Sequence, residues 1–194
     1  MSGGKDGHSL DMNGGELRGN QAGDGGGLYI TSSNGDGLAG VLTETAVRGN
    51  RATDGAGLSV RTTVLRLSSA TVEDNEASRL GGGAKIFEAD LSIEDNSLIT
   101  ANVAVDGGGV ATDEETTGAK VDCQDSTLSM NQASSRGGGV LMLAAAVNRV
   151  ETVVFEARSC DFVDNSPEDL YLKYGGTYTL GEGATVRCPN DGCE

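Results

Sequence analysis

The sequence is poor in large rings, in proline and in histidine. It has three Phe, four Tyr and no Trp in 194 residues, so a core built around aromatic side chains is not expected. Two Pro beside 31 Gly fit neither collagen nor a Pro-rich disordered chain. His8 is the only histidine, which argues against a histidine-based catalytic triad or metal site.

Positive charge and long apolar runs are also scarce. The formal net charge of −15 is the wrong sign for binding the phosphates of a nucleic acid or an anionic membrane surface. The longest apolar run, from Val140 to Val147, is far shorter than the ~20 residues of a membrane-spanning helix. The N-terminal residues contain no apolar segment typical of a signal peptide. We therefore predict neither a nucleic-acid partner nor membrane insertion by this segment.

What the chain does contain is an internal repeat anchored on asparagine. Typical units read Asn50-Arg-Ala-Thr-Asp-Gly-Ala-Gly and Asn102-Val-Ala-Val-Asp-Gly-Gly-Gly. Successive anchors are 25–34 residues apart, a period typical of solenoid proteins. Helical repeats are excluded, because a glycine triplet in each unit would break a helix. The anchors are Asn20, Asn50, Asn75, Asn102, Asn131 and Asn165.

Apolar residues around each anchor alternate with a period of two, which indicates β-strands. Three strand signals occur in each repeat, as in Leu58/Val60, Leu65/Leu67 and Ala70/Val72. Stacked in register, such units form a parallel β-helix, whose coils themselves connect the parallel strands. We predict an all-β, right-handed parallel β-helix (β-solenoid) of about six to seven coils of three short strands over residues 1–182. Lateral loops are expected at Thr31–Ala39, Asp113–Lys120 and Leu143–Asn148.

The two ends of the sequence give further expectations. Residues 183–194 lie beyond the last coil, and Cys188 and Cys193 within them could close a small loop or begin a Cys-rich module. At the other end, Leu10, Met12 and Leu17 already fill core columns. The chain therefore looks like a β-helix that is truncated at its N-terminus, and a signal peptide would have been lost with the missing part.

The repeated residues have structural roles. An Asn at the same corner of every coil predicts a ladder of side-chain amides that pairs backbone groups at the turn. The small Ala two residues later fits a bend, and the glycines permit positive φ and close approach of backbones. We therefore interpret the Asn, Ala and Gly motifs as scaffold and not as a functional site.

The repeat resembles a known family. The pattern of a hydrophobic residue three positions before Asn, followed by Gly-Gly and an aliphatic residue, is similar to the FxxN and GGA[ILV] repeats of the chlamydial polymorphic outer membrane proteins. It resembles more broadly the pectin-lyase-like β-helix domains of surface proteins. Matching segments include Val47 to Asn50 and Phe162 to Asn165, although aliphatic residues mostly replace the Phe of the family and Gly mostly replaces its Ala. The resemblance implies adhesion and display outside the cell or on its surface, and supplies no catalytic residue set.

Pectin-lyase-like enzymes act through carboxylates and basic residues on the outer surface of the coils. The best stacked pair of acids is Asp122 and Glu156, with Arg158 on the same face. Adjacent coils would place the two carboxylates roughly 5 Å apart, close to the separation in a retaining glycosidase, and Arg158 could bind a uronate carboxylate. We favour an ordinary solvated face with an ion pair, so these residues are weak catalytic candidates.

Two further groups are weak candidates for ligand binding. Asp24 and Asp54 occupy the same position in neighbouring repeats and could bridge Ca²⁺, although a turn-capping role is favoured. No other cofactor is predicted. Tyr29, Leu141 and Tyr171 share one outward column, where we expect them to be exposed and able to stack on sugar rings.

Cys123 and Cys160 fall in inward columns on different strands. Counting from the anchors places Cys123 beside Ala157, so a bond between the two cysteines would need a slip in register. We favour separate small core thiols. Four Cys in an acidic repeat protein nevertheless favour an oxidising compartment.

Three functions remain open at this stage. The favoured one is a non-catalytic surface or secreted domain that acts as an adhesin or stalk, with glycans or another cell-surface protein as partners. The first alternative is a polysaccharide-active lyase, epimerase or glycoside hydrolase, which would need the acidic pair described above. The second is a purely structural protein of the cell wall or envelope.

Overall fold

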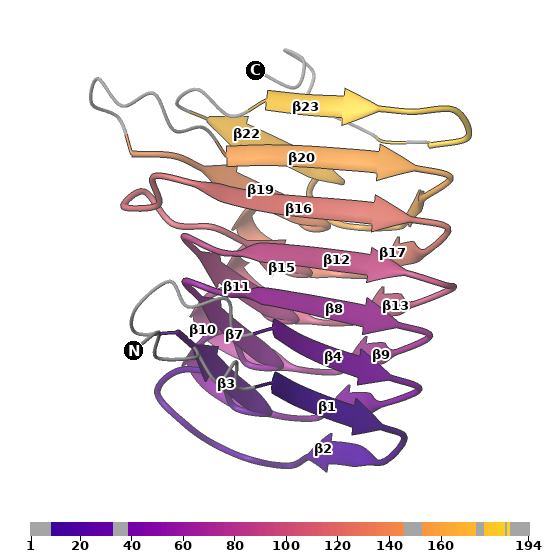
Figure 1. The fold of residues 1–194 in the computed structure, drawn as a ribbon. Coiled ribbons are helices and arrows are strands. Elements are labelled where there is room, and N and C mark those ends of the chain that lie inside the picture. Colours follow the sequence, from indigo (N-terminus) through magenta and orange to yellow (C-terminus); the bar gives the residue numbers. More distant parts are fainter. Residues whose placement is uncertain (1–8, 33–38, 146–152, 174–176, 185, 187–194) are drawn as a thin grey trace, which may run out of the picture.

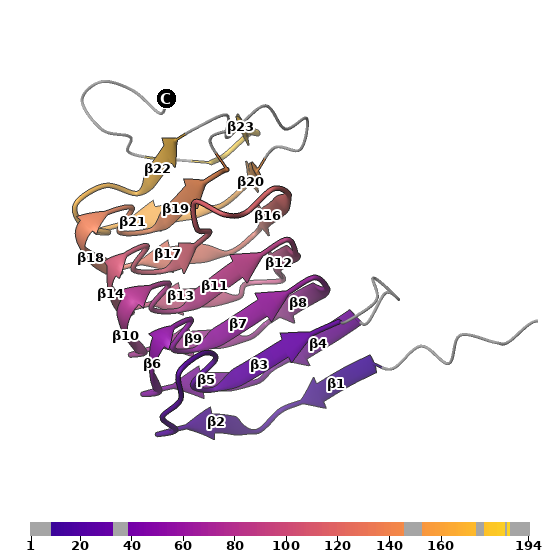
Figure 2. The ribbon, with the colours of Figure 1, turned by 90° about the vertical axis from the view of Figure 1, so that its left-hand side faces the viewer.

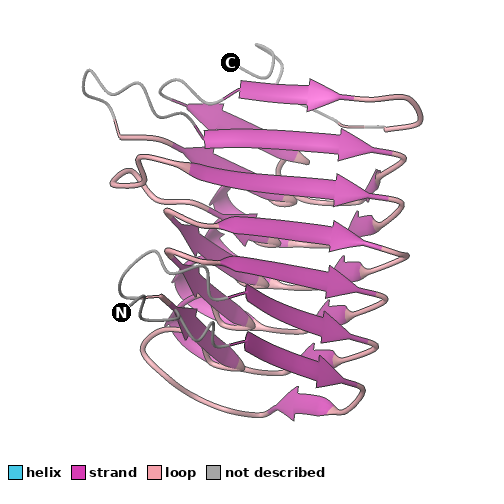
Figure 3. Cartoon of the chain, viewed as in Figure 1, coloured by secondary structure: helices cyan, strands magenta, loops and turns pink. Residues whose placement is uncertain are grey.

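The computed structural model describes residues 9–32, 39–145, 153–173, 177–184 and 186. Every regular element in these residues is a β-strand (Figure 3). None of the described residues belongs to a helix long and apolar enough to cross a membrane. Four parallel sheets run along the molecule and join successive coils by hydrogen bonds (Figure 1). The predicted all-β class and parallel β-helix are confirmed.

A complete coil contributes one strand to each of four sheets, numbered in the order in which the chain passes through them. The first sheet contains β1 (Ser9–Asn13), β4 (Ala39–Thr43), β8 (Val64–Ser68), β12 (Asp90–Glu94), β16 (Ala119–Gln124), β20 (Val153–Arg158) and β23 (Thr177–Leu180). The second contains β2 (Glu16–Arg18), β5 (Ala46–Arg48), β9 (Thr71–Glu73), β13 (Leu98–Thr100), β17 (Thr127–Ser129) and β21 (Asp161–Val163). The third contains β6 (Arg51–Asp54), β10 (Glu76–Leu80), β14 (Val103–Asp106) and β18 (Gln132–Arg136). The fourth contains β3 (Leu28–Thr31), β7 (Leu58–Arg61), β11 (Ala84–Phe87), β15 (Val110–Ala111), β19 (Val140–Leu143) and β22 (Leu170–Lys173).

The third sheet corrects the expectation of three strands per coil. Its four strands stack along one edge of the β-helix (Figure 2). They occupy the segment between Asn and the glycines in four of the repeats, where the alternation of apolar residues is too short to be recognised. This segment has four residues in β6 and β14 but five in β10 and β18. The register consequently shifts at every pairing in this sheet, as bulges absorb the extra residue.

The coil count also differs from the prediction. The described residues make about five turns, one between each pair of successive anchors, and not six to seven coils. The prediction counted one coil for each Asn anchor. The first and last repeats, however, contribute no full strand to the third sheet. Gln21 and Asp24 at one end, and Ser166 at the other, pair with it only through isolated bridges.

The core is a set of apolar columns that run the length of the β-helix. The inward pairs predicted from the sequence are in register, for example Leu65 with Leu91 and Leu67 with Ile93. These four side chains are fully buried, and burying an aliphatic side chain of this size contributes about 1.5–3 kcal/mol. The predicted loop Asp113–Lys120 connects the fourth sheet to the first, although its last residues, Ala119 and Lys120, already belong to β16. The predicted loops at Thr31–Ala39 and Leu143–Asn148 lie partly outside the described residues.

The six asparagines form a continuous ladder at the corner between the second and third sheets. Asn102 Nδ2 donates to Val72 O in the preceding coil (2.9 Å) and to Asn131 Oδ1 in the following coil (3.0 Å). Asn102 Oδ1 accepts from the backbone N–H of Asn75 (3.0 Å) and from Asn75 Nδ2 (2.9 Å). Each of these polar groups is therefore paired although Asn75, Asn102 and Asn131 are fully buried. The same pattern repeats at the other steps, and Asn165 Nδ2 donates to Asp169 Oδ1 (3.0 Å) at the last one.

The ladder also explains the glycine motif. A Cβ added to Gly109, the third glycine of its triplet, would lie 2.4 Å from Gly139 O and 3.2 Å from Asn131 Nδ2. The third glycine thus leaves room for the amide of the next coil. The first glycine, as at Gly107 (φ 67°), adopts the left-handed conformation that makes the corner.

The residue before each ladder Asn is also in the left-handed region. Four of these six residues are not glycine, and for them the conformation is strained by about 1–2 kcal/mol. The hydrogen bonds of the ladder hold the chain in this conformation in successive coils. The six residues and their φ angles are Gly19 (65°), Gly49 (60°), Asp74 (54°), Ala101 (53°), Met130 (53°) and Asp164 (55°).

Cys123 and Cys160 form a disulfide, so the prediction of separate thiols is wrong. Cys123 pairs in register with Ala157, as expected, but no slip is needed for the bond. Cys160 lies in the corner between β20 and β21, and its side chain belongs to the core. There it meets the side chain of Cys123, which is on β16 in the preceding coil. The Cα atoms are 6.2 Å apart, within the range that a disulfide spans. Cys188, Cys193 and His8 lie outside the described residues.

Removing one rung should destabilise the whole fold. Asn102→Ala removes the side-chain partner of Val72 O and of the Asn75 backbone N–H in the buried corner, and it removes one of the two hydrogen bonds of Asn131 Oδ1 and of Asn75 Nδ2. We therefore expect the free energy of unfolding to fall by about 1–3 kcal/mol. Urea denaturation followed by circular dichroism measures this change. Asn13→Ala, at an exposed strand end, is the control and should have little effect. Equal stability of Asn102→Ala and the wild type would refute the structural role of the ladder.

The disulfide should contribute to stability through the chain that it closes. Its residues are 37 apart, and restricting a loop of that size in the unfolded state contributes about 2–4 kcal/mol. The double variant Cys123→Ala/Cys160→Ala should therefore unfold at a lower urea concentration than the wild type. Under reducing conditions the unfolded wild type also loses the disulfide. The urea midpoints for refolding of the wild type and the double variant should then approach each other. A midpoint unchanged by the double substitution in oxidising buffer would contradict this assignment.

Candidate functional site

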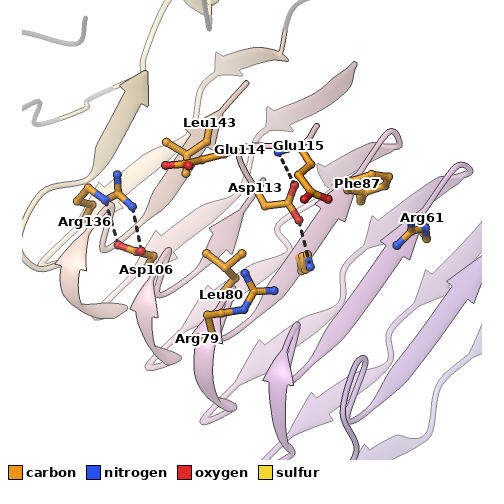
Figure 4. Close-up of a pocket in the computed structure, with 11 residues that line it drawn as sticks. Arg61, Arg79, Leu80, Phe87, Asp106, Asp113, Glu114, Glu115, Arg136 and Leu143 are labelled. Carbon is orange, nitrogen blue, oxygen red and sulfur yellow. Dashed lines mark hydrogen bonds and ion pairs between the residues drawn. The ribbon is translucent and has the colours of Figure 1, made fainter. Parts of the chain in front are cut away.

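An open groove with a volume of about 460 Å³ is the candidate site. It follows the outer surface where the third and fourth sheets adjoin (Figure 4), across strands β7, β10, β11, β14, β18 and β19. Glu114 and Glu115, in the lateral loop after β15, also line it. The side chains come from positions that point away from the core, so the stacking of the coils leaves their identities free. The remaining lining residues are Arg61, Arg79, Leu80, Lys85, Phe87, Asp106, Asp113, Arg136 and Leu143.

One end of the groove is formed by Asp106 and Arg136 (Figure 4). The guanidinium of Arg136 binds the carboxylate through two hydrogen bonds, Nε–Oδ1 (3.1 Å) and Nη2–Oδ2 (3.0 Å). Burial by itself would raise the pKa of Asp106, but hydrogen bonds from Arg136 and Ser135 outweigh this effect and lower the pKa below its ordinary value. The Arg136 guanidinium also lies over the ring of Tyr171, 5.6 Å from its centroid. Asp106 is thus held as a carboxylate.

The other end is formed by Arg61 and Phe87 (Figure 4). The Arg61 guanidinium lies over the Phe87 ring, 4.2 Å from its centroid. Within the described part of the chain, no ion pair or side-chain hydrogen bond engages this guanidinium. Stacking orients the planar group, and its N–H donors are available to a ligand.

The wall between the ends contains apolar side chains. Leu80, Ala111, Leu141 and Leu143 pack into a separate apolar cluster outside the core, with Tyr171 against them. The expectation that Leu141 is exposed is wrong, because it is fully buried in this cluster. Tyr29, Leu141 and Tyr171 do share one column, through Ser59, Lys85 and Ala111. Tyr29 is 46% exposed, but the three side chains do not form an exposed stacking platform.

Asp24 and Asp54 are neighbours in the stack, as the repeat predicted, and they pair through a parallel bridge. Asp54 is buried, and its carboxylate pairs with Lys85 (2.8 Å) and with Arg79, whereas Asp24 is exposed. Two cationic side chains therefore already pair with the carboxylate that a Ca²⁺ ion would need. The described residues contain no group of three His, Cys, Asp or Glu side chains arranged to hold a metal ion.

Asp122 and Glu156 also stack, in register on β16 and β20, outside the groove. Arg158 Nη2 binds Asp122 Oδ2 (3.1 Å), and Lys120 Nζ lies 2.8 Å from Glu156 Oε2 and 3.6 Å from Asp122 Oδ2. The hydrogen bond from Lys120 lowers the pKa of Glu156, and the same bond raises the pKa of Lys120. A general acid of a glycosidase needs a raised pKa, which this arrangement does not provide. The geometry is that of a partly solvated ion-pair network.

The residues of the groove were not among the candidates predicted from the sequence. Arg61, Lys85, Phe87 and Arg136 carried no motif, because outward positions of a solenoid vary freely from coil to coil. The available signal was positional: Arg61, Phe87 and Asp113 follow the glycines at equivalent outward places in three successive repeats. Only the register between coils places them on one surface.

Comparison with family models, with curated proteins and with solved structures found no match for this chain. The described geometry itself assigns the chain to the parallel β-solenoids.

The ion pair at the end of the groove predicts a specific acid sensitivity. Because the pKa of Asp106 is lowered in the folded state, its contribution to stability is present above the unfolded-state pKa, about 3.9, and is lost as the pH falls through the folded value. Asp106→Asn should therefore be less stable than the wild type at pH 7, by about 1 kcal/mol, and the difference should shrink below about pH 4. Urea denaturation between pH 7 and pH 3 measures it, and Arg136→Gln should reproduce the profile. A difference independent of pH would contradict the role of this pair.

Proposed function

We propose that this chain is a non-catalytic module of a surface or secreted protein, acting as an adhesin or stalk, and that the groove binds a glycan. The observation that carries the proposal is the composition of the groove. It combines an aromatic ring and aliphatic side chains with fixed polar groups, on a surface that spans several coils. Sugars present apolar C–H faces and hydroxyl edges, so a site of this kind suits them.

The architecture supports a display function. The ladder of amides and the in-register columns make each coil a rigid support for the next, so side chains on successive coils keep fixed separations of about 4.8 Å. A polymer lying along the groove would meet a row of contacts without reorganising the protein. Such preorganisation reduces the entropic cost of binding.

The location outside the cell rests on two observations. The repeat resembles the FxxN and GGA[ILV] units of the chlamydial polymorphic outer membrane proteins and the wider pectin-lyase-like surface domains, and that resemblance implies display at the cell surface. The buried disulfide between Cys123 and Cys160 is typical of proteins that fold in an oxidising compartment. A cell-surface protein remains the alternative partner within the same function.

The enzymatic alternative would use Asp122 and Glu156. Their carboxylates pair with Lys120 and Arg158, and the lowered pKa of Glu156 favours the ionised form. This arrangement supports an ion-pair network more than a general acid. A purely structural function would leave the groove without a ligand. A binding experiment therefore distinguishes a structural function from glycan binding.

A glycan array tests the proposal, first with calcium and then with a chelator. We expect the wild type to bind a defined subset of glycans. Phe87→Ala and Arg61→Ala should each weaken binding by about tenfold, because each removes one contact with the sugar and a loss of about 1.4 kcal/mol is a factor of ten. Arg66→Ala, on the first sheet outside the groove, is the matched control and should bind like the wild type. Cleavage of a bound glycan would instead favour the enzyme. Absence of binding in both conditions, or equal loss in Arg66→Ala, would overturn the assignment of the groove.

A further inference from the structure

A buried lysine in the wall of the groove lies between two aspartates from neighbouring coils. Lys85 Nζ is 2.8 Å from Asp54 Oδ2 and 3.2 Å from Asp113 Oδ2. Lys85 is on β11, Asp54 ends β6 in the coil before it, and Asp113 follows β15 in the coil after it. The exposed fractions of the three side chains are 11%, 6% and 15%, so the group is largely shielded from water.

The two aspartates are held differently. Asp113 Oδ1 accepts hydrogen bonds from the backbone N–H of Glu115 (3.0 Å) and from Thr116 Oγ1 (3.2 Å), which leaves Oδ2 facing the lysine. Asp54 Oδ1 accepts from the N–H of Leu80 (3.3 Å), and Asp54 Oδ2 pairs with Arg79 as well as with Lys85. Asp113 therefore has two donors on the oxygen that points away from the amine. Asp54 keeps a cationic partner even without Lys85.

We propose that Lys85 and Asp113 join in an intramolecular isopeptide bond, with Asp54 as the group that transfers the protons. An amine, a carboxyl group and a proton-transfer group within hydrogen-bond distance are the components that amide formation requires. The folded chain supplies the proximity, since both reacting groups are fixed on adjacent coils.

The reaction balances without any external reagent. Lys85 begins as an ammonium and Asp113 as a carboxylate, and Asp54 Oδ2 passes two ammonium protons to Asp113 Oδ2. The lone pair of Lys85 Nζ forms a bond to Asp113 Cγ, and the Cγ–Oδ2 bond breaks. Oδ2 leaves as water, and the amide nitrogen keeps one proton. The negative charge that develops on Asp113 Oδ1 is stabilised by the donors Glu115 N–H and Thr116 Oγ1.

The charges that remain after amide formation favour Asp113 over Asp54 as the residue that bonds to Lys85. After the reaction, the buried Asp54 carboxylate remains paired with Arg79, so no isolated charge is left. The bond would tie β11 to the loop after β15, one coil further along. This inference does not depend on the proposed glycan binding, because it concerns a covalent link within the chain.

The intact mass of the denatured and reduced protein tests the proposal. We expect the wild type to be lighter than its sequence by one water molecule, and protease digestion to give a branched peptide that contains residues 85 and 113. Lys85→Met and Asp113→Ala should restore the mass calculated from the sequence. Asp54→Asn should restore it too, although both reacting groups are still present.

The control is the second lysine ion pair of similar geometry. Lys120 Nζ lies 2.8 Å from Glu156 Oε2, but the two side chains are 39% and 32% exposed. Lys120→Met should therefore keep the loss of water. A wild-type mass equal to that of the sequence would overturn the proposal, whatever the folding of the variants. A digest that contains only linear peptides would also overturn the proposal, because a succinimide at an Asp-Gly bond removes the same mass without forming a branched peptide. A branched peptide that persists in Asp54→Asn would overturn the role of Asp54.

Discussion

Every coil of this protein depends on one hydrogen-bonded column, the ladder of asparagine amides. From Asn50 to Asn165, each rung donates two hydrogen bonds through Nδ2 and accepts two through Oδ1, and it directly follows a backbone residue in the left-handed region. Residues such as Ala101 and Met130 adopt this conformation at a cost of about 1–2 kcal/mol each. The ladder offsets that strain and pairs backbone groups that water cannot reach. Without the ladder, the corner would keep this backbone strain and would also contain buried polar groups without hydrogen-bond partners.

The remaining features of the repeat follow from this column. The third glycine leaves space for the amide of the next coil, and Ala52, Ala77 and Ala104, each two residues after a ladder Asn, pack into a small separate cluster. With the ladder corner fixed, coil length varies in the segment before the glycines, in the connections between the fourth and first sheets, and by one residue in the turn between β12 and β13. The outward side chains are not constrained by the repeat, and they vary from coil to coil. The groove, with its ion pairs at Asp106 and Lys85, lies on this variable surface.

The sequence predicts the scaffold far better than the site, for a physical reason. Asn, Gly and the inward aliphatic residues recur because every coil meets the same requirement, so columns such as Leu65–Leu91 and the pairing of Cys123 with Ala157 could be predicted. The strands of the third sheet escaped detection because their alternation of apolar residues is too short to be recognised. The disulfide escaped because columns of two different sheets meet at a corner. The burial of Leu141 and the contacts of Lys85 depend on which outward residues of neighbouring coils happen to meet.

The exchange of the asparagine side-chain amide protons with solvent tests the central role of the ladder most directly. In nuclear magnetic resonance spectra, the Nδ2 protons of Asn75, Asn102 and Asn131 should exchange as slowly as backbone amides of the core, because each donates to a buried acceptor. The side-chain protons of exposed Asn13 should exchange rapidly in the same sample. Exchange of the ladder amides at the rate of Asn13 would contradict the account.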